Sequence, residues 1–264
     1  MGQDETSRAG TLWAGTNEKA FEAVAVRTRT TVRAPLQATV LRAVETQHVA
    51  ATMRLVGSAE AQAVLEAALE TSKPPIPPGC ERLDYLLYTP FRYPPSPWPS
   101  RFRGPADPGV FYAAEHARTA LAEVAHWRLK VLLDAVELTA LDPTAHTLFA
   151  TRIEAATIDA AELRPVARRK AVLDPDEYSA AQAWGREVRA SGIGAIRYPS
   201  VRDRPDGVCW ALLTPAAFRS KPTLQASWLI RITRDGARCR STVAPFASFD
   251  FSAAQLLCRP TGAR

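Results

Sequence analysis

Three residue types that suit chemistry on a dinucleotide recur at regular spacing near the middle of the chain. Arg101, Tyr112 and Glu123 follow one another at intervals of 11 residues. A guanidinium grips phosphate through charge-assisted hydrogen bonds, and a carboxylate stabilises the positive charge that develops on a sugar. A later segment, GIGAIRYPSVRD, adds Ser200 and Arg202. The set predicts an enzyme that holds a dinucleotide and acts at its sugar.

Taken singly, each of these residues has an ordinary structural interpretation. Loop arginines and helix carboxylates usually face water, and a tyrosine at the end of a strand is often half-buried. Ser200 follows Pro199, where a serine commonly belongs to a turn. The functional interpretation therefore depends on the order and spacing of the whole set.

The elements that must position these residues are a mixture of helices and strands. Arg101 lies in a proline-rich but aromatic loop, which we interpret as packed and functional rather than as a linker. Tyr112 belongs to a predicted strand over 110–113, and Glu123 to a predicted helix over 117–136. Further strands are expected at 193–198, in GVCWALLTP and in SWLIRITR. Without a regular βαβ alternation, this mixture indicates an α+β fold.

The chain divides into three predicted parts. Residues 1–30 are polar and irregular and are expected to be flexible. Residues 31–80 form an N-terminal helical segment packed on the core, with a helical pattern from about Pro35 and a helix that Ser58 caps. Residues 81–264 form the main domain.

Two elements inside that main domain carry specific local signals. Residues 85–89 read as a short strand before the proline-rich loop. In LDPDEYSAAQAWGREVRASG, Asp174 is the expected N-cap of a helix and Gly192 its C-terminal stop.

The composition narrows the classes of partner. The 264 residues carry a formal net charge of +6, which favours an anionic partner such as a nucleotide, a nucleic acid or an acidic protein. The four cysteines and four histidines are dispersed, without metal-ligand spacing, so no metal site is expected. No signal peptide or membrane-length apolar run is visible, and the expectation is a cytoplasmic protein with free thiols.

Several standard alternatives find little support. The chain has no G-x-S-x-G elbow, no P-loop and no GxGxxG fingerprint opening a helix. Arg42, Gln47 and Arg54 on the expected early helix give only weak support for a DNA-reading helix. Nucleic-acid binding on charge alone is the weakest alternative, because the arginines are distributed.

From about Val40 to Phe218, the chain resembles the RES-domain toxins of bacterial toxin–antitoxin pairs. The arginine, glutamate and serine for which that domain is named match Arg101, Glu123 and Ser200, and its strand tyrosine matches Tyr112. AVETQH, the run over 65–75 and TPFRYPP add to the resemblance. The loop departs from the family pattern, since SRFRG places Arg103 where the family usually has asparagine.

The resemblance implies an α+β fold similar to ADP-ribosyltransferase toxins, with a cleft for NAD⁺. It implies cleavage of the nicotinamide–ribose bond by phosphorolysis or hydrolysis, with inorganic phosphate as a possible co-substrate and without a metal. Protein ADP-ribosylation is the alternative activity. The implied catalytic residues are Arg101, Tyr112 and Glu123, and the implied substrate-binding residues are Arg92, Tyr93, Ser200 and Arg202.

The same resemblance implies partners. Family members pair with an Xre-type helix-turn-helix antitoxin that blocks the cleft, and they usually form homodimers. DNA would then be contacted only indirectly, through the antitoxin, and no membrane contact is expected. A catalytically inactive RES-like module that only holds such an antitoxin is the alternative from outside the enzymes.

Overall fold

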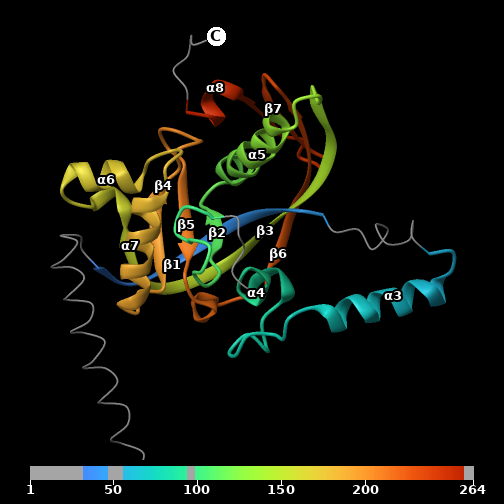
Figure 1. Cartoon of the computed structure of the whole chain (residues 1–264), viewed down its shortest axis with the longest axis horizontal. Coiled ribbons are helices and arrows are strands. Elements are labelled where there is room, and N and C mark those ends of the chain that lie inside the picture. The colour runs from blue at the N-terminus through green and yellow to red at the C-terminus, as the bar shows by residue number, and fades with distance from the viewer. Residues whose placement is uncertain (1–31, 47–55, 94–98, 259–264) are drawn as a thin grey trace, which may run out of the picture.

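The computed structural model describes residues 32–46, 56–93 and 99–258, and Figure 1 shows the whole chain. The predicted flexible segment 1–30 lies outside the described residues. The described strands are β1 (Val32–Glu45), β2 (Phe111–Ala114), β3 (Ala140–Asp159), β4 (Ala195–Pro199), β5 (Val208–Leu212), β6 (Thr223–Thr233), β7 (Gly236–Ser241) and β8 (Ser248–Ser252). The described helices are α3 (Ala59–Ser72), α4 (Tyr85–Arg92), α5 (Ala117–Asp134), α6 (Val166–Val172), α7 (Ser179–Ala190) and α8 (Ala253–Leu256), with 3₁₀ turns at Ala160–Glu162 and Pro215–Ala217.

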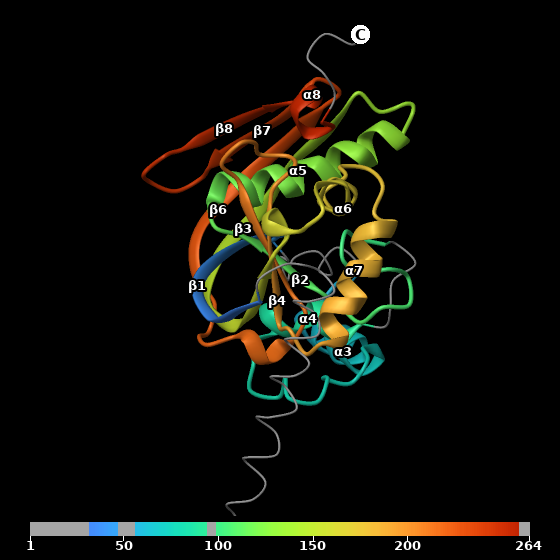
Figure 2. The ribbon, with the colours of Figure 1, turned by 90° about the vertical axis from the view of Figure 1, so that its left-hand side faces the viewer.

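One mixed sheet organises the molecule. Its strand order is β1-β2-β5-β4-β3-β6-β7-β8, and an additional pairing of β1 with β3 closes the first five strands into a ring. The long strand β3 leaves this ring and pairs with β6, so that β6, β7 and β8 extend as a wing (Figure 2). β3 and β4 run parallel, and the crossover that such a pair requires contains α6 and α7. The α+β fold predicted from the sequence is confirmed.

Alternation along the ring strands decides which side chains face α5. Successive residues of a strand point to opposite faces. On β2, Phe111 packs in one apolar cluster while Tyr112 packs against the other, which contains the buried side of α5. On β5, Cys209 and Trp210 divide in the same way. Because of this alternation, Tyr112 and Cys209 lie on the same side of the sheet as the helix that carries Glu123.

Several predicted elements are confirmed. The strand expected over 110–113 is β2, the helix over 117–136 is α5, and the three later strands are β4, β5 and β6. Ser58 caps α3 by accepting the Ala61 N–H. Gly192 follows α7 with φ of +78°, a left-handed conformation that favours glycine.

Three local predictions are wrong. The helical pattern from Pro35 is the strand β1, because its residues pair with β3 along their length and Val40 is buried in the ring. Residues 85–89 belong to the helix α4, which Asp84 caps at the Leu86 N–H. Asp174 instead accepts the N–H groups of two following residues in a turn, and α7 begins at Ser179.

Within residues 32–46, 56–93 and 99–258, none of the helices combines the length and apolar character that a membrane span requires.

Candidate active site

A cavity of about 370 Å³ opens where α5 passes β1, β2 and the loop before β2. This volume is at the lower end of the range for small-molecule sites. Its lining brings together Arg101, Tyr112 and Glu123, the three residues spaced by 11 in the sequence. The lining also includes Arg42, Trp127, Tyr178, Tyr198 and Cys209.

Glu123 is held by one carboxylate oxygen. Its Oε1 accepts the Ser200 hydroxyl at 2.6 Å and lies 3.6 Å from the Cys209 thiol. Burial raises the pKa of Cys209 well above its ordinary value, so this thiol stays protonated and donates to the carboxylate. Within the described chain, Oε2 has no hydrogen-bond partner. Glu123 is thus fixed in orientation and retains one oxygen for a ligand.

Ser200 acts behind the cavity rather than in its wall. It is almost completely buried and is not among the residues that line the cavity. Its Oγ accepts the backbone N–H groups of Arg202 and Asp203, each at 3.1 Å. With these two donors on its oxygen, the hydroxyl directs its own proton to Glu123. The geometry therefore makes Ser200 a partner of Glu123.

Tyr112 connects β2 to the loop that carries Arg101. Its hydroxyl accepts the Phe102 N–H at 3.0 Å and lies 2.9 Å from the Ser100 hydroxyl. Burial raises the pKa of Tyr112, so the phenol is neutral at physiological pH. A hydroxyl fixed in this way holds the loop in register with the strand.

Arg101 is buried without a carboxylate partner among the described residues. Its Nη1 donates to the carbonyls of Val172, at 3.1 Å, and Asp174, at 2.7 Å, and the guanidinium stacks 4.8 Å from the ring centroid of Tyr178. The other guanidinium nitrogens make no hydrogen bond within the described chain. Arg101 lines the cavity and Arg103 does not, which distinguishes the two arginines of the loop.

Arg42 is a cavity residue that sequence reasoning assigned to a different role. It lies on β1, donates to the Tyr112 carbonyl at 2.9 Å and sits 4.7 Å over the Phe111 ring. Its Nε is buried without a hydrogen-bond partner. Burial lowers its pKa to about 10, so it stays charged at neutral pH without a neighbouring carboxylate. An arginine in the middle of the apolar run from Val40 to Val44 is the signal that could have identified it.

Trp127 is a second cavity residue that lies outside the sequence motif. It follows Glu123 by one helical turn on α5, lines the cavity and leaves 44% of its surface exposed. A large aromatic residue one turn from a singled-out carboxylate is the signal that the sequence offered.

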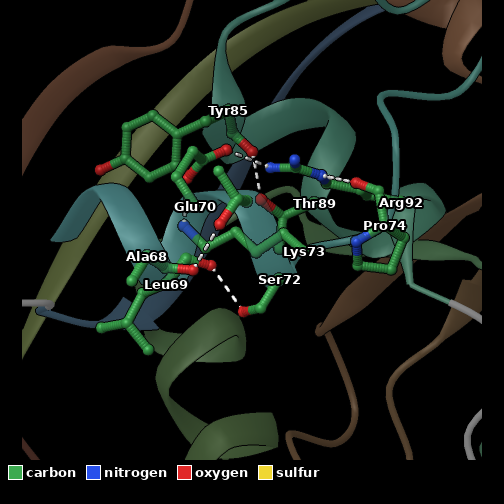
Figure 3. A network of polar contacts seen from close by, with 10 residues as sticks. Ala68, Leu69, Glu70, Ser72, Lys73, Pro74, Tyr85, Thr89 and Arg92 are labelled. Atoms are coloured by element: carbon green, nitrogen blue, oxygen red, sulfur yellow. Dashed lines mark hydrogen bonds and ion pairs between the residues drawn. The ribbon is translucent and has the colours of Figure 1, made fainter. Parts of the chain in front are cut away.

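Two of the predicted substrate-binding residues lie in a second hollow, formed by α3, α4 and β1, whose lining shares Arg42 with the cavity. Arg92 donates through Nε to the Pro74 carbonyl at 2.6 Å and through Nη1 to Glu70 at 3.0 Å (Figure 3). Tyr93 is exposed and lines the same hollow. The structure does not bring either residue into the lining of the cavity.

Arg202 is also absent from the cavity lining. It is 1% exposed, and its guanidinium donates to the carbonyls of Leu256 and Pro175 and to the sulfur of Cys258. These contacts tie α8 and the segment before α7 to the loop that contains Ser200. The position of Arg202 fits a structural role better than contact with an anionic substrate.

Comparison with known proteins identifies the domain. The RES domain family model matches residues 76–232, well over half of the chain. Comparison with curated proteins gives no match. Among solved structures, the M. tuberculosis MbcT–MbcA toxin–antitoxin complex contains a chain that is 14% identical, with a TM-score of 0.40, covering 83% of this chain and 93% of that one. On the match of the family model, the chain belongs to the RES domain family.

Proposed function

We propose that this RES-domain protein is a toxin that consumes NAD⁺ by cleaving the bond between nicotinamide and ribose. The observation that carries the proposal is the convergence of Arg101, Tyr112 and Glu123 on one cavity, with Glu123 oriented by Ser200. The choice of NAD⁺ as substrate comes from the family resemblance, and the cavity contains a guanidinium and a carboxylate that suit its phosphates and its sugar.

The chemistry assigned to Glu123 follows from the charge of the reacting sugar. Cleavage of a glycosidic bond passes through an oxocarbenium-like transition state. The electron pair of the breaking C1′–N bond goes to the nicotinamide nitrogen, which leaves as a neutral ring, so no strong general acid is needed. A fixed carboxylate stabilises the cation at C1′ without reorganising during the reaction.

The charge of Arg101 suits the anionic part of the substrate. Arg101 lines the cavity and not the neighbouring hollow, and it has no carboxylate partner in the described chain. Guanidinium groups bind phosphate oxygens through paired, charge-assisted hydrogen bonds. We assign Arg101 to the pyrophosphate of NAD⁺. Phosphate as nucleophile would form the new C1′–O bond, and water in its place would release a proton to solvent.

Nicotinamide release tests the proposal directly. Purified protein is incubated with NAD⁺, with and without inorganic phosphate, and free nicotinamide is followed over time. We expect release that falls by about 100-fold or more in Glu123→Gln, in line with the loss of one oriented electrostatic group. The matched control is Glu187→Gln, which removes an exposed carboxylate that pairs with Arg168.

The outcomes separate the alternatives. Release that requires phosphate supports phosphorolysis, and release without it supports hydrolysis. Labelling of a protein by radioactive NAD⁺ would favour the ADP-ribosyltransferase alternative. Absence of release under every condition would overturn the enzymatic proposal and favour the inactive binding module.

We also propose a helix-turn-helix antitoxin of the Xre type as partner, a homodimeric assembly and a cytoplasmic location. The apolar side chains exposed on α5 beside the cavity, Trp127 and Val131, support a partner that covers its mouth. Co-expression with the product of a neighbouring small helix-turn-helix gene should abolish nicotinamide release. Light scattering of the isolated protein measures the number of subunits.

A further inference from the structure

A buried carboxylate joins the Ser200 loop to the first turn of α5. Asp203 is 7% exposed, and its two oxygens have different partners on the helix. Oδ1 accepts the Arg118 Nε at 2.8 Å, and Oδ2 accepts the Thr119 hydroxyl at 2.8 Å. Thr119 precedes Glu123 by one helical turn, so the anchor and the candidate catalytic carboxylate share one segment of α5.

The backbone of the same residue contacts Ser200. The Asp203 N–H donates to the Ser200 Oγ at 3.1 Å, beside the Arg202 N–H. The loop closes through the bonds from Gly207 N–H to the Asp203 carbonyl, at 2.8 Å, and from Ser200 N–H to the Gly207 carbonyl, at 2.7 Å. A side chain at Gly207 would meet the Asp203 carbonyl at 2.3 Å, so the loop needs glycine there. Asp203 thus ties this closed loop to α5.

Arg118 is in turn held in place from its far side. Its guanidinium lies 4.7 Å from the ring centroid of Phe251 on β8. An arginine restrained in this way presents its Nε to Asp203 with less loss of side-chain freedom. The carboxylate is therefore held by a restrained donor and by the buried Thr119 hydroxyl.

We propose that Asp203 is a positioning residue for the reaction, acting through Ser200 on Glu123. By fixing the loop to α5, Asp203 sets the separation between the Ser200 hydroxyl and the Glu123 carboxylate, and this bond orients the carboxylate toward the sugar. The catalytic role of Asp203 rests on the proposed function. The claim that Asp203 sets the contact between Ser200 and Glu123 does not.

A double-mutant cycle tests whether Asp203 acts through Ser200. We expect Asp203→Ala to lower kcat for nicotinamide release by roughly 100-fold, the cost of a displaced catalytic group, with KM changed by less than about three-fold. In a Ser200→Ala background, the same change should lower kcat by less than about three-fold, because the shared contact is already lost. Losses that multiply in the double variant would overturn the proposal.

Asp159 supplies the matched control. It is 3% exposed and also anchors an arginine and a backbone N–H, the Arg197 Nη1 at 2.8 Å and the Ala161 N–H at 2.8 Å, but it does not contact the Ser200 loop. Asp159→Ala should lower the melting temperature while kcat stays within about two-fold of wild type. A kcat loss equal to that of Asp203→Ala would show that destabilisation alone explains both variants.

A structural readout keeps this test separate from the proposed function. Crystal structures of the Asp203→Ala and Asp159→Ala proteins report the Ser200–Glu123 distance whether or not NAD⁺ is cleaved. The bond should be broken in the first variant and kept in the second. Thr119→Val, nearly equal in volume, replaces Asp203→Ala if that variant does not fold. A bond that persists in every anchor variant would overturn the inference even in an active enzyme.

Discussion

The cavity beside α5 and the hollow between α3 and α4 both contain arginine and tyrosine side chains. These side chains have different partners in the two regions. In the hollow, Arg92 is paired with Glu70 and with a backbone carbonyl, and Tyr93 is exposed. In the cavity, Arg101 carries a charge that no carboxylate of the described chain neutralises, and Arg42 lines both regions. An arginine already paired within its own chain has little to gain from an anionic ligand, whereas a desolvated, unpaired one gains much.

The two regions also differ in how well their helices and strands are packed. The cavity is surrounded by strands that pair on both sides and by the buried face of α5. The helix α3 has no buried residue, and its link to α4 passes through the partly exposed Arg92–Glu70 pair. Exposed ion pairs contribute little to stability because water screens them. Burial and convergence, rather than residue type, distinguish the candidate site from its neighbour.

Removing one guanidinium from each region gives the largest expected contrast. Arg101→Gln should lower kcat/KM for nicotinamide release by about 10- to 100-fold, the usual weight of a hydrogen bond to a charged group. Arg92→Gln, the matched change in the hollow, should leave kcat/KM within about two-fold of wild type. Steady-state kinetics with NAD⁺ measure both. An equal loss in the two variants would remove the distinction between the regions.

Removing one phenolic hydroxyl from each region sharpens the comparison through stability. Tyr112→Phe leaves the Phe102 N–H without its partner, so the free energy of unfolding should fall by about 1–3 kcal/mol. The hydroxyl of Tyr93 is on an exposed side chain, so Tyr93→Phe should change nothing that urea unfolding resolves. Two indistinguishable unfolding curves would contradict the role of Tyr112 in holding the loop.

A pH response should come from the α5 side of the molecule. His126 on α5 lies 2.8 Å from the Leu256 carbonyl, and burial, together with the charge of Arg202, lowers its pKa from 6.5 to about 3. Below pH 6.5, His126 binds a proton in the unfolded chain but stays neutral in the folded chain until the pH approaches its lowered pKa. The free energy of unfolding should therefore fall by about 1.4 kcal/mol per pH unit between these two values.

Urea unfolding of wild type and His126→Gln at pH 7 and pH 5 checks this expectation. The wild type should lose about 2 kcal/mol more than the variant between the two pH values. Burial also lowers the pKa of His146, so the variant retains some dependence of the same sign. Parallel behaviour of the two proteins would show that His126 ionises freely in the folded state.

Local chemistry explains which elements sequence reasoning located. Ser58 before an alanine-rich run and Gly192 after a helix act within a few residues, and both signals are confirmed. The pattern from Pro35 failed because β1 is formed by pairing with β3, more than a hundred residues further along the chain. Periodicity over a short window cannot register a partner at that distance.

The sequence by itself determined the α+β class, the family and the set Arg101, Tyr112, Glu123 and Ser200, because motif order and local capping are written in the chain. Only the tertiary structure decided which of these residues touch the cavity. It placed Ser200 behind Glu123, put Arg42 between the cavity and the neighbouring hollow, and left Arg92, Tyr93 and Arg202 outside the cavity lining. The physical reason is that burial and unpaired charge arise when distant strands and helices pack, and neither property belongs to a residue alone.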